Sequence, residues 1–189
     1  MSNFEYVFSL LVIILGLGLA EVLGGIARSV RRREKLRIGW ATGLLATWVM
    51  TETVIFWEII WQSRNVLSNN SIALFPGFAV TGLYYFAGAL VFPEDLDRQA
   101  SLDDYFMREK ARVIGAILAA VVLAFGWRRL VMGPEAWAGV SLYAWVSLAA
   151  IYVIAPVAML TRRRNVAIAA MALLVVIDLL DPIESLIWP

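Results

Sequence analysis

The 189-residue chain contains no cysteine and no histidine, and these two absences exclude many kinds of chemistry. Without cysteine it can form no disulfide, thiolate nucleophile or cysteine-ligated metal site. Without histidine it has no imidazole base, no bis-histidine haem ligation and no HExxH zinc motif. The sequence also has no P-loop and no Gly-x-Ser-x-Gly motif. We therefore expect no enzyme activity, no catalytic residues, no bound metal and no cofactor.

Charge is scarce as well. Charged residues make up 16% of the chain and hydrophobic residues 61%, and the mean hydropathy is +0.78. An average soluble domain is about a quarter charged and about half apolar. The apolar residues form runs of about 20 residues, the length that crosses about 30 Å of hydrocarbon. The sequence predicts one all-α domain, a bundle of six transmembrane helices over residues 7–27, 39–61, 72–92, 113–131, 137–160 and 166–185.

The distribution of basic residues predicts the orientation of these spans. Thirteen of the 16 Lys and Arg residues follow the first, third and fifth spans, and short cytoplasmic loops are enriched in Lys and Arg. We therefore expect both termini in the periplasm of a bacterial inner membrane. Basic residues placed beside apolar runs are topology signals, so we expect no binding to nucleic acid. No basic residue precedes the first span, so it is predicted to stay as a membrane helix and not to be a cleaved signal peptide.

The connection before the fourth span predicts a short additional helix. Ser101 followed by Asp104 is a plausible N-cap pair. Leu102, Tyr105 and Phe106 then share one helical face, which predicts an amphipathic helix over about 102–112 at the cytoplasmic membrane surface, running into the fourth span.

Small residues indicate how the helices pack. Two spans carry them at every fourth position: Gly16, Ala20 and Gly24 in the first, and Ala116, Ala120 and Ala124 in the fourth. Such stripes let helix backbones approach closely in lipid, either within one chain or between copies in a homo-oligomer, which we expect. Six spans also divide into two three-helix units of opposite orientation, so we considered a 3+3 inverted repeat, as found in many transporters.

The ionisable groups inside the spans are the candidate functional residues, and the clearest four are Glu21, Glu52, Glu58 and Asp178. Such groups are costly in lipid and usually face the bundle interior. Glu52 lies 13 residues beyond Gly39, about 20 Å into the membrane. No Lys or Arg lies at that depth, so we expect its carboxyl to be largely protonated, because desolvation disfavours the charged form. It could exchange a proton or bind a cation, or it could be a neutral residue that holds helices together.

The other three acidic residues have two interpretations each. Glu58 and Asp178 are expected near the outer surface, as a salt-bridge cluster with Arg128 and Arg129 or as an acidic vestibule. Glu21 is expected to face inward as a paired carboxylate or as a cytoplasmic ion exit. Three polar residues on the second span, Thr47, Thr51 and Gln62, fall roughly on one face with Glu58 and would lead towards Glu52. Tyr84 and Tyr85, in the middle of the third span, are expected to pack and to form hydrogen bonds.

The opening helix carries a weak resemblance to a family. The stretch Ile14-Leu15-Gly16-Leu17-Gly18, followed by Glu21, Gly24, Gly25 and Arg28, resembles the first helix of uncharacterised small bacterial inner-membrane proteins. In these proteins a glycine-rich helix ends in an arginine-rich cytoplasmic turn. The resemblance covers about the first 35 residues. It implies a bacterial inner-membrane protein and brings no activity with it.

Two functions are compatible with these features. The first is a small carboxylate-dependent transporter or channel for protons or monovalent cations, with Glu52 as the central group. The alternative is a non-transporting membrane subunit that binds a protein or lipid partner, anchored to the lipid bilayer by the basic first loop. Loss of flux in a Glu52→Gln variant would favour the first function.

Overall fold

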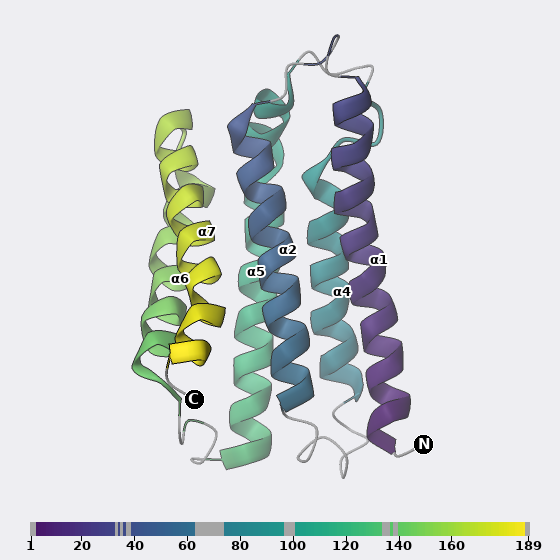
Figure 1. The fold of residues 1–189 in the computed structure, drawn as a ribbon, viewed down its shortest axis with the longest axis vertical. Coiled ribbons are helices and arrows are strands. Elements are labelled where there is room, and N and C mark those ends of the chain that lie inside the picture. Colours follow the sequence, from purple (N-terminus) through teal and green to yellow (C-terminus); the bar gives the residue numbers. More distant parts are fainter. Residues whose placement is uncertain are drawn as a thin grey trace.

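The computed structural model describes residues 3–32, 34, 36, 39–62, 74–96, 101–133, 137 and 140–187. These residues form helices and, among themselves, no β-strand. The helices are α1 (Asn3–Arg31), α2 (Trp40–Gln62), α4 (Leu74–Val91), α5 (Leu102–Met132), α6 (Leu142–Leu160) and α7 (Arg164–Ile187), shown in Figure 1. The predicted all-α class is therefore confirmed.

Four of the helices are long and apolar enough to cross a membrane. The apolar stretches are Phe8–Arg31, Trp40–Trp61, Leu102–Leu130 and Leu142–Leu160, with lengths of 24, 22, 29 and 19 residues. The apolar part of α4, Phe75–Val91, is shorter. A helix satisfies its backbone hydrogen bonds internally, as lipid requires. These helices indicate a membrane-embedded protein, and the number of six crossings stays a prediction.

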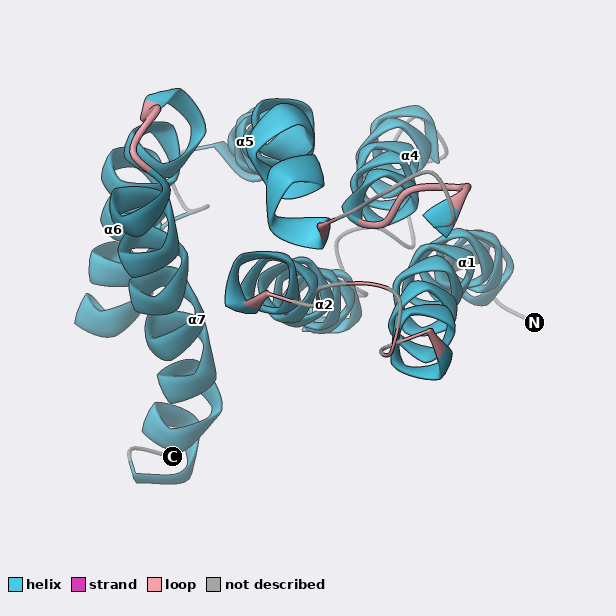
Figure 2. Cartoon of the chain, turned by 90° about the horizontal axis from the view of Figure 1, so that it is seen from above, coloured by secondary structure: helices cyan, strands magenta, loops and turns pink. Residues whose placement is uncertain are grey.

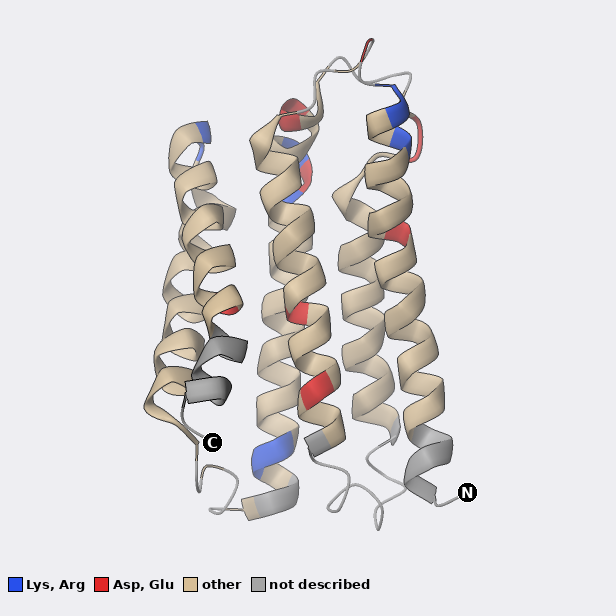
Figure 3. Cartoon of the chain, viewed as in Figure 1, with Lys and Arg blue, Asp and Glu red and all other residues tan. Residues whose placement is uncertain are grey.

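The helices form a four-helix bundle with a helical pair beside it. Helices α1, α2, α4 and α5 pack together, and α6 and α7 lie side by side against α5 and α2 (Figures 1 and 2). Helix α2 is central, since it contacts α1, α4, α5 and α7. We call the end at which α1, α4 and α6 terminate the basic end, because Lys and Arg gather there (Figure 3). Helix α1 begins and α7 ends at the opposite end (Figure 1).

Helices α1 and α4 approach so closely that only glycine fits at their contact. A Cβ atom on Gly88 would lie 2.8 Å from the Gly18 carbonyl oxygen, and one on Gly18 would lie 3.1 Å from Tyr85 Cα. The predicted stripe of the first span is not used in this contact: nothing lies within 4 Å of a Cβ built on Gly16, and Ala20 is exposed. The close approach is therefore made by Gly18, two positions further along α1, with Gly88 of α4.

The small-residue stripe of the fourth span does pack inside the protein. Ala116 and Ala120 are buried, and Ala124 is half-buried against the core. The stripe of α5 thus packs within the chain, whereas packing of the α1 stripe against another copy stays a prediction.

The segment 102–112 is the first third of α5 and runs without a break into the fourth predicted span. Ser101 is the N-cap residue, as predicted, but its side chain makes no capping hydrogen bond. Leu102 and Phe106 are 0% and 1% exposed, and Thr42 donates a hydrogen bond of 2.8 Å to the Leu102 carbonyl oxygen. The apolar face of the segment is thus covered by neighbouring helices. An amphipathic pattern does not show whether such a face packs against other helices or against the membrane surface.

The helix contacts do not follow a 3+3 repeat. The first and third helices of the first half, α1 and α4, pack closely along their length, whereas α5 and α7, the corresponding helices of the second half, make no comparable contact. The structure therefore gives the predicted inverted repeat no support.

Candidate functional site

Two carboxylic acids are buried together between α2 and α7. Glu52 is 4% exposed and Asp178 is 2% exposed. Thr51, the residue before Glu52, contacts Asp178: its Oγ1 lies 3.4 Å from Asp178 Oδ2 and 2.9 Å from the Trp48 carbonyl oxygen. Helices α2 and α7 both start at the basic end (Figure 1). Residues that are equally far from the start of each helix therefore lie at a similar depth. Glu52 is 12 residues from the start of α2 and Asp178 is 14 from the start of α7, or about 18 and 21 Å.

Tyr84 brings a third helix, α4, to this site. Its side chain is 3% exposed. The Tyr84 hydroxyl donates a hydrogen bond to the Glu52 carboxyl and lies within electrostatic range of Asp178. Its ring stacks on that of Phe56, with centroids 5.0 Å apart and planes inclined by 22°. We call Thr51, Glu52, Tyr84 and Asp178 the acidic cluster.

The indole of Trp48 lies one helical turn before Glu52, on the side towards the basic end. Trp48 is 0% exposed, and its Nε1 atom is buried with no hydrogen-bond partner among the described residues. Positions 48, 52 and 56 are four residues apart and share one face of α2. Trp48 and Phe56, both buried, therefore lie one turn before and one turn after Glu52 on the same face of α2.

The structure separates the four predicted acidic residues. Asp178 was expected near the surface with Glu58, and this grouping is corrected: Asp178 lies with Glu52, at similar depth, while Glu58 is exposed one and a half turns further along α2. Glu21, expected to face inward, lies on an exposed face of α1. Arg128 is half-buried near the end of α5.

Of the three supporting polar residues, Thr51 alone is seen in the acidic cluster. Thr47 is half-buried, and its hydroxyl donates to the Gly43 carbonyl oxygen at 3.0 Å, within its own helix. Gln62 is the last residue of α2, and its side chain lies outside the described part of the chain. The predicted polar stripe on α2 therefore reaches the site through one residue.

A second buried polar group, at the basic end, was not predicted. Asp103 is 2% exposed and forms an ion pair with Arg164 at the start of α7. A Cβ atom on Gly39 would overlap the Asp103 carboxylate, so the start of α2 packs directly against it. Lys110 is 3% exposed, and its Nζ donates to three carbonyl oxygens at the end of α6, those of Ala158, Met159 (3.1 Å) and Thr161 (2.7 Å).

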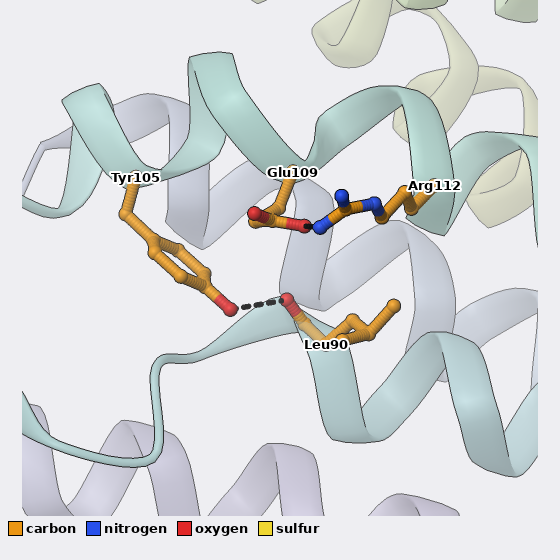
Figure 4. A network of polar contacts seen from close by, with 4 residues as sticks. All are labelled: Leu90, Tyr105, Glu109 and Arg112. Atoms are coloured by element: carbon orange, nitrogen blue, oxygen red, sulfur yellow. Dashed lines mark hydrogen bonds and ion pairs between the residues drawn. The ribbon is translucent and has the colours of Figure 1, made fainter.

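Both charges in this second group are held by partners that suit them. A lysine ammonium favours the carbonyl oxygens at a helix C-terminus, and a carboxylate favours a helix N-terminus. On an adjacent face of α5, Tyr105 donates to the Leu90 carbonyl oxygen of α4 at 3.1 Å, and Arg112 pairs with Glu109 at 2.7 Å (Figure 4). We call Asp103, Lys110 and Arg164 the basic-end clamp, because they join α5 to the α6–α7 pair.

The acidic cluster is thus the better candidate for function. Its groups are two carboxyls, a phenol and a hydroxyl, which can exchange protons or offer oxygen ligands to a cation. Comparison with protein-family models, with curated proteins and with solved structures finds no match to this chain. The resemblance of the first 35 residues to small inner-membrane proteins stays a prediction.

Proposed function

We propose that the protein carries protons or monovalent cations across a bacterial inner membrane, with Glu52 as the central binding group. The observation that supports this most directly is the burial of Glu52 beside Asp178, on different helices. Ionisable groups are expensive in the apolar interior of a membrane protein, where they commonly mark an ion or proton path. Two carboxyls in one apolar site oppose each other's ionisation, so the site favours holding one proton or one cation between them.

The proposed path crosses a bundle of six transmembrane helices with periplasmic termini. A proton or cation enters from the end at which α1 begins, on the side of Glu58, and reaches Glu52, Asp178 and Tyr84 at mid-depth. It leaves towards the basic end, on the cytoplasmic side. Glu21 has no part in this path, since its side chain is exposed on the outer face of α1.

The test is flux into proteoliposomes under an imposed membrane potential, read with a pH-sensitive dye. We expect Glu52→Gln to reduce proton flux at least about tenfold, since it removes the exchangeable carboxyl, and Asp178→Asn to reduce it as well. The matched control is Glu58→Gln, the same change on the exposed side of the same helix, which should leave most of the flux. Replacing protons by sodium or potassium gradients identifies the carried species. Unchanged flux in Glu52→Gln would disprove the assignment.

One observation favours a second function, a membrane subunit that binds another protein. Glu21 lies on an exposed face of α1 beside Gly16 and Ala20, and a charged group facing lipid is costly. A partner helix, from another protein or a second copy, would cover this face through the small residues. In that case Ala20→Leu should abolish co-purification of the partner, whereas Glu52→Gln should leave it intact.

A further inference from the structure

The buried indole of Trp48 needs an acceptor. Trp48 is the largest of the fully buried side chains of α2, and its Nε1–H meets no hydrogen-bond acceptor among the described residues. A buried donor without a partner is costly, and the great majority of such groups in native proteins are paired. An indole can only donate a hydrogen bond, so a partner for it must offer an acceptor atom such as a carboxylate oxygen.

Glu52 is the carboxyl one helical turn from Trp48 on the same helix. Side chains four residues apart on a helix have Cβ atoms about 5–6 Å apart, and helical side chains lean towards the N-terminus. The Glu52 side chain is therefore directed towards the turn of α2 that carries Trp48. In the present state the Glu52 carboxyl is bonded to Tyr84 instead. A change of the Glu52 side-chain rotamer would carry the carboxyl from Tyr84, on α4, to the indole, on the side of the basic end.

We propose that Trp48 is a positioning residue of the transport site, whose indole N–H binds the Glu52 carboxylate once its proton has left towards the basic end. This inference rests on the proposed function, which requires Glu52 to ionise. Tyr84 can donate to an ionised carboxyl or accept from a protonated one, whereas the indole can only donate. Hydrogen bonds to an ionised acceptor are about twice as strong as neutral ones. The two donors therefore differ: Tyr84 holds both forms of Glu52, and Trp48 favours the ionised form.

Among the residues whose side chains the structure describes, few other charged groups face this site. Asp178 comes from α7 and Tyr84 from α4. Of the helices that also pack against α2, α5 carries its ionisable residues within its first third, 103–112, and near its end, and α1 carries Glu21 on an exposed face. Asp178 is therefore the competing acceptor for the indole, and the experiment must separate it from Glu52.

The test follows the indole N–H signal of Trp48 by NMR, in the full-length protein labelled with ¹⁵N-tryptophan. The chain has 8 Trp residues, and the signal is identified by its loss in Trp48→Phe. We expect it to move downfield as the pH rises in the wild type, and to stay fixed in Glu52→Gln. A signal that does not depend on pH in the wild type would overturn the proposal. So would a titration that survives in Glu52→Gln and disappears in Asp178→Asn, because the indole would then bind Asp178.

Flux provides a second readout. Trp48→Phe keeps an aromatic ring and removes the N–H, so we expect flux to fall about tenfold, the effect of losing one hydrogen bond to a charged group. The control Trp40→Phe changes an indole at the start of the same helix that is 84% exposed, and it should leave flux unchanged. Full flux in Trp48→Phe would overturn the positioning role. The NMR result does not depend on transport, so a failure of the proposed function, seen as full flux in Glu52→Gln, is distinguished from a failure of this inference.

Discussion

The contact between α1 and α4 gives the sharpest prediction about stability. In Gly88→Ala the new Cβ atom would lie 2.8 Å from the Gly18 carbonyl oxygen and 3.3 Å from its carbonyl carbon. These are backbone atoms, so no flexible side chain can move aside and α1 must shift away from α4. Gly82 is on the same helix, and nothing lies within 4 Å of a Cβ atom built there. Gly82→Ala is therefore the matched control.

The two substitutions should have effects of opposite sign. Both gain from the higher helix propensity of alanine, by at most about 1 kcal/mol in water. Forcing an extra carbon into a packed contact costs about 1–3 kcal/mol. We expect Gly88→Ala to lower the free energy of unfolding by about 1–2 kcal/mol, and Gly82→Ala to leave it unchanged or raise it slightly.

The measurement is unfolding of the purified protein in mixed micelles by added SDS, followed by circular dichroism. The same comparison can be made on α1, where a Cβ atom on Gly18 would lie 3.1 Å from Tyr85 Cα and Gly16 has no neighbour within 4 Å. Equal stability of Gly88→Ala and Gly82→Ala would refute the close approach of α1 and α4, and with it the packing of the four-helix bundle.

Three further predictions concern the basic end, and each is measured by the same unfolding assay. Lys110→Met should destabilise the protein by about 2–4 kcal/mol, because it leaves carbonyl oxygens at the end of α6 buried without their donor; an effect below about 0.5 kcal/mol would contradict the clamp. Asp103→Asn and Arg164→Gln should be non-additive in a double-mutant cycle, with a coupling of about 1–3 kcal/mol, whereas additive effects would show that the ion pair is unimportant. Arg112→Gln, at a side chain that is 69% exposed, should change stability by less than about 1 kcal/mol, and a larger loss would show that the surface pair matters more than its exposure allows.

The apolar runs predicted most of the fold because the length of a membrane helix is set by the bilayer. The third span, predicted over 72–92, agrees to within two residues with the bounds of α4, and the second, predicted over 39–61, agrees to within one residue with those of α2. The apolar runs did not extend to the start of α5, where a helix face is covered by other helices and not by lipid. The buried face of α5 includes Val113, Ile114 and Ile117, and its helical period continues back through Lys110 and Phe106. The charged residues Asp103 and Lys110 made this part of the buried face hard to recognise in the sequence. Their spacing of seven residues nevertheless places both on the same face of the helix.

The candidate site was only partly predictable for a related reason. Glu52 could be chosen from sequence because its depth depends on its own helix alone. Asp178 was misplaced because its partner depends on how α7 packs against α2, and apolar periodicity does not specify which neighbour a helix meets. The hydrogen bond from Tyr84 to Glu52 likewise depends on how α4 packs against α2. Whether the Trp48 indole finds an acceptor depends on the same packing, and neither feature produces a recognisable residue spacing in the sequence.

The contact between α1 and α4 and the attachment of the α6–α7 pair to the bundle use different interactions, and this difference bears on function. Within lipid, the hydrophobic effect does not draw one apolar helix to another, so close packing and polar contacts must do so. Helices α1 and α4 are joined by backbone contact at Gly18 and Gly88, which does not depend on charge. The α6–α7 pair is joined to the bundle by polar groups at two depths, the basic-end clamp and the contact between Thr51 and Asp178. If the acidic cluster binds a proton or a cation, as proposed, the change in charge would act at the contact between α2 and α7, which includes polar groups as well as apolar packing.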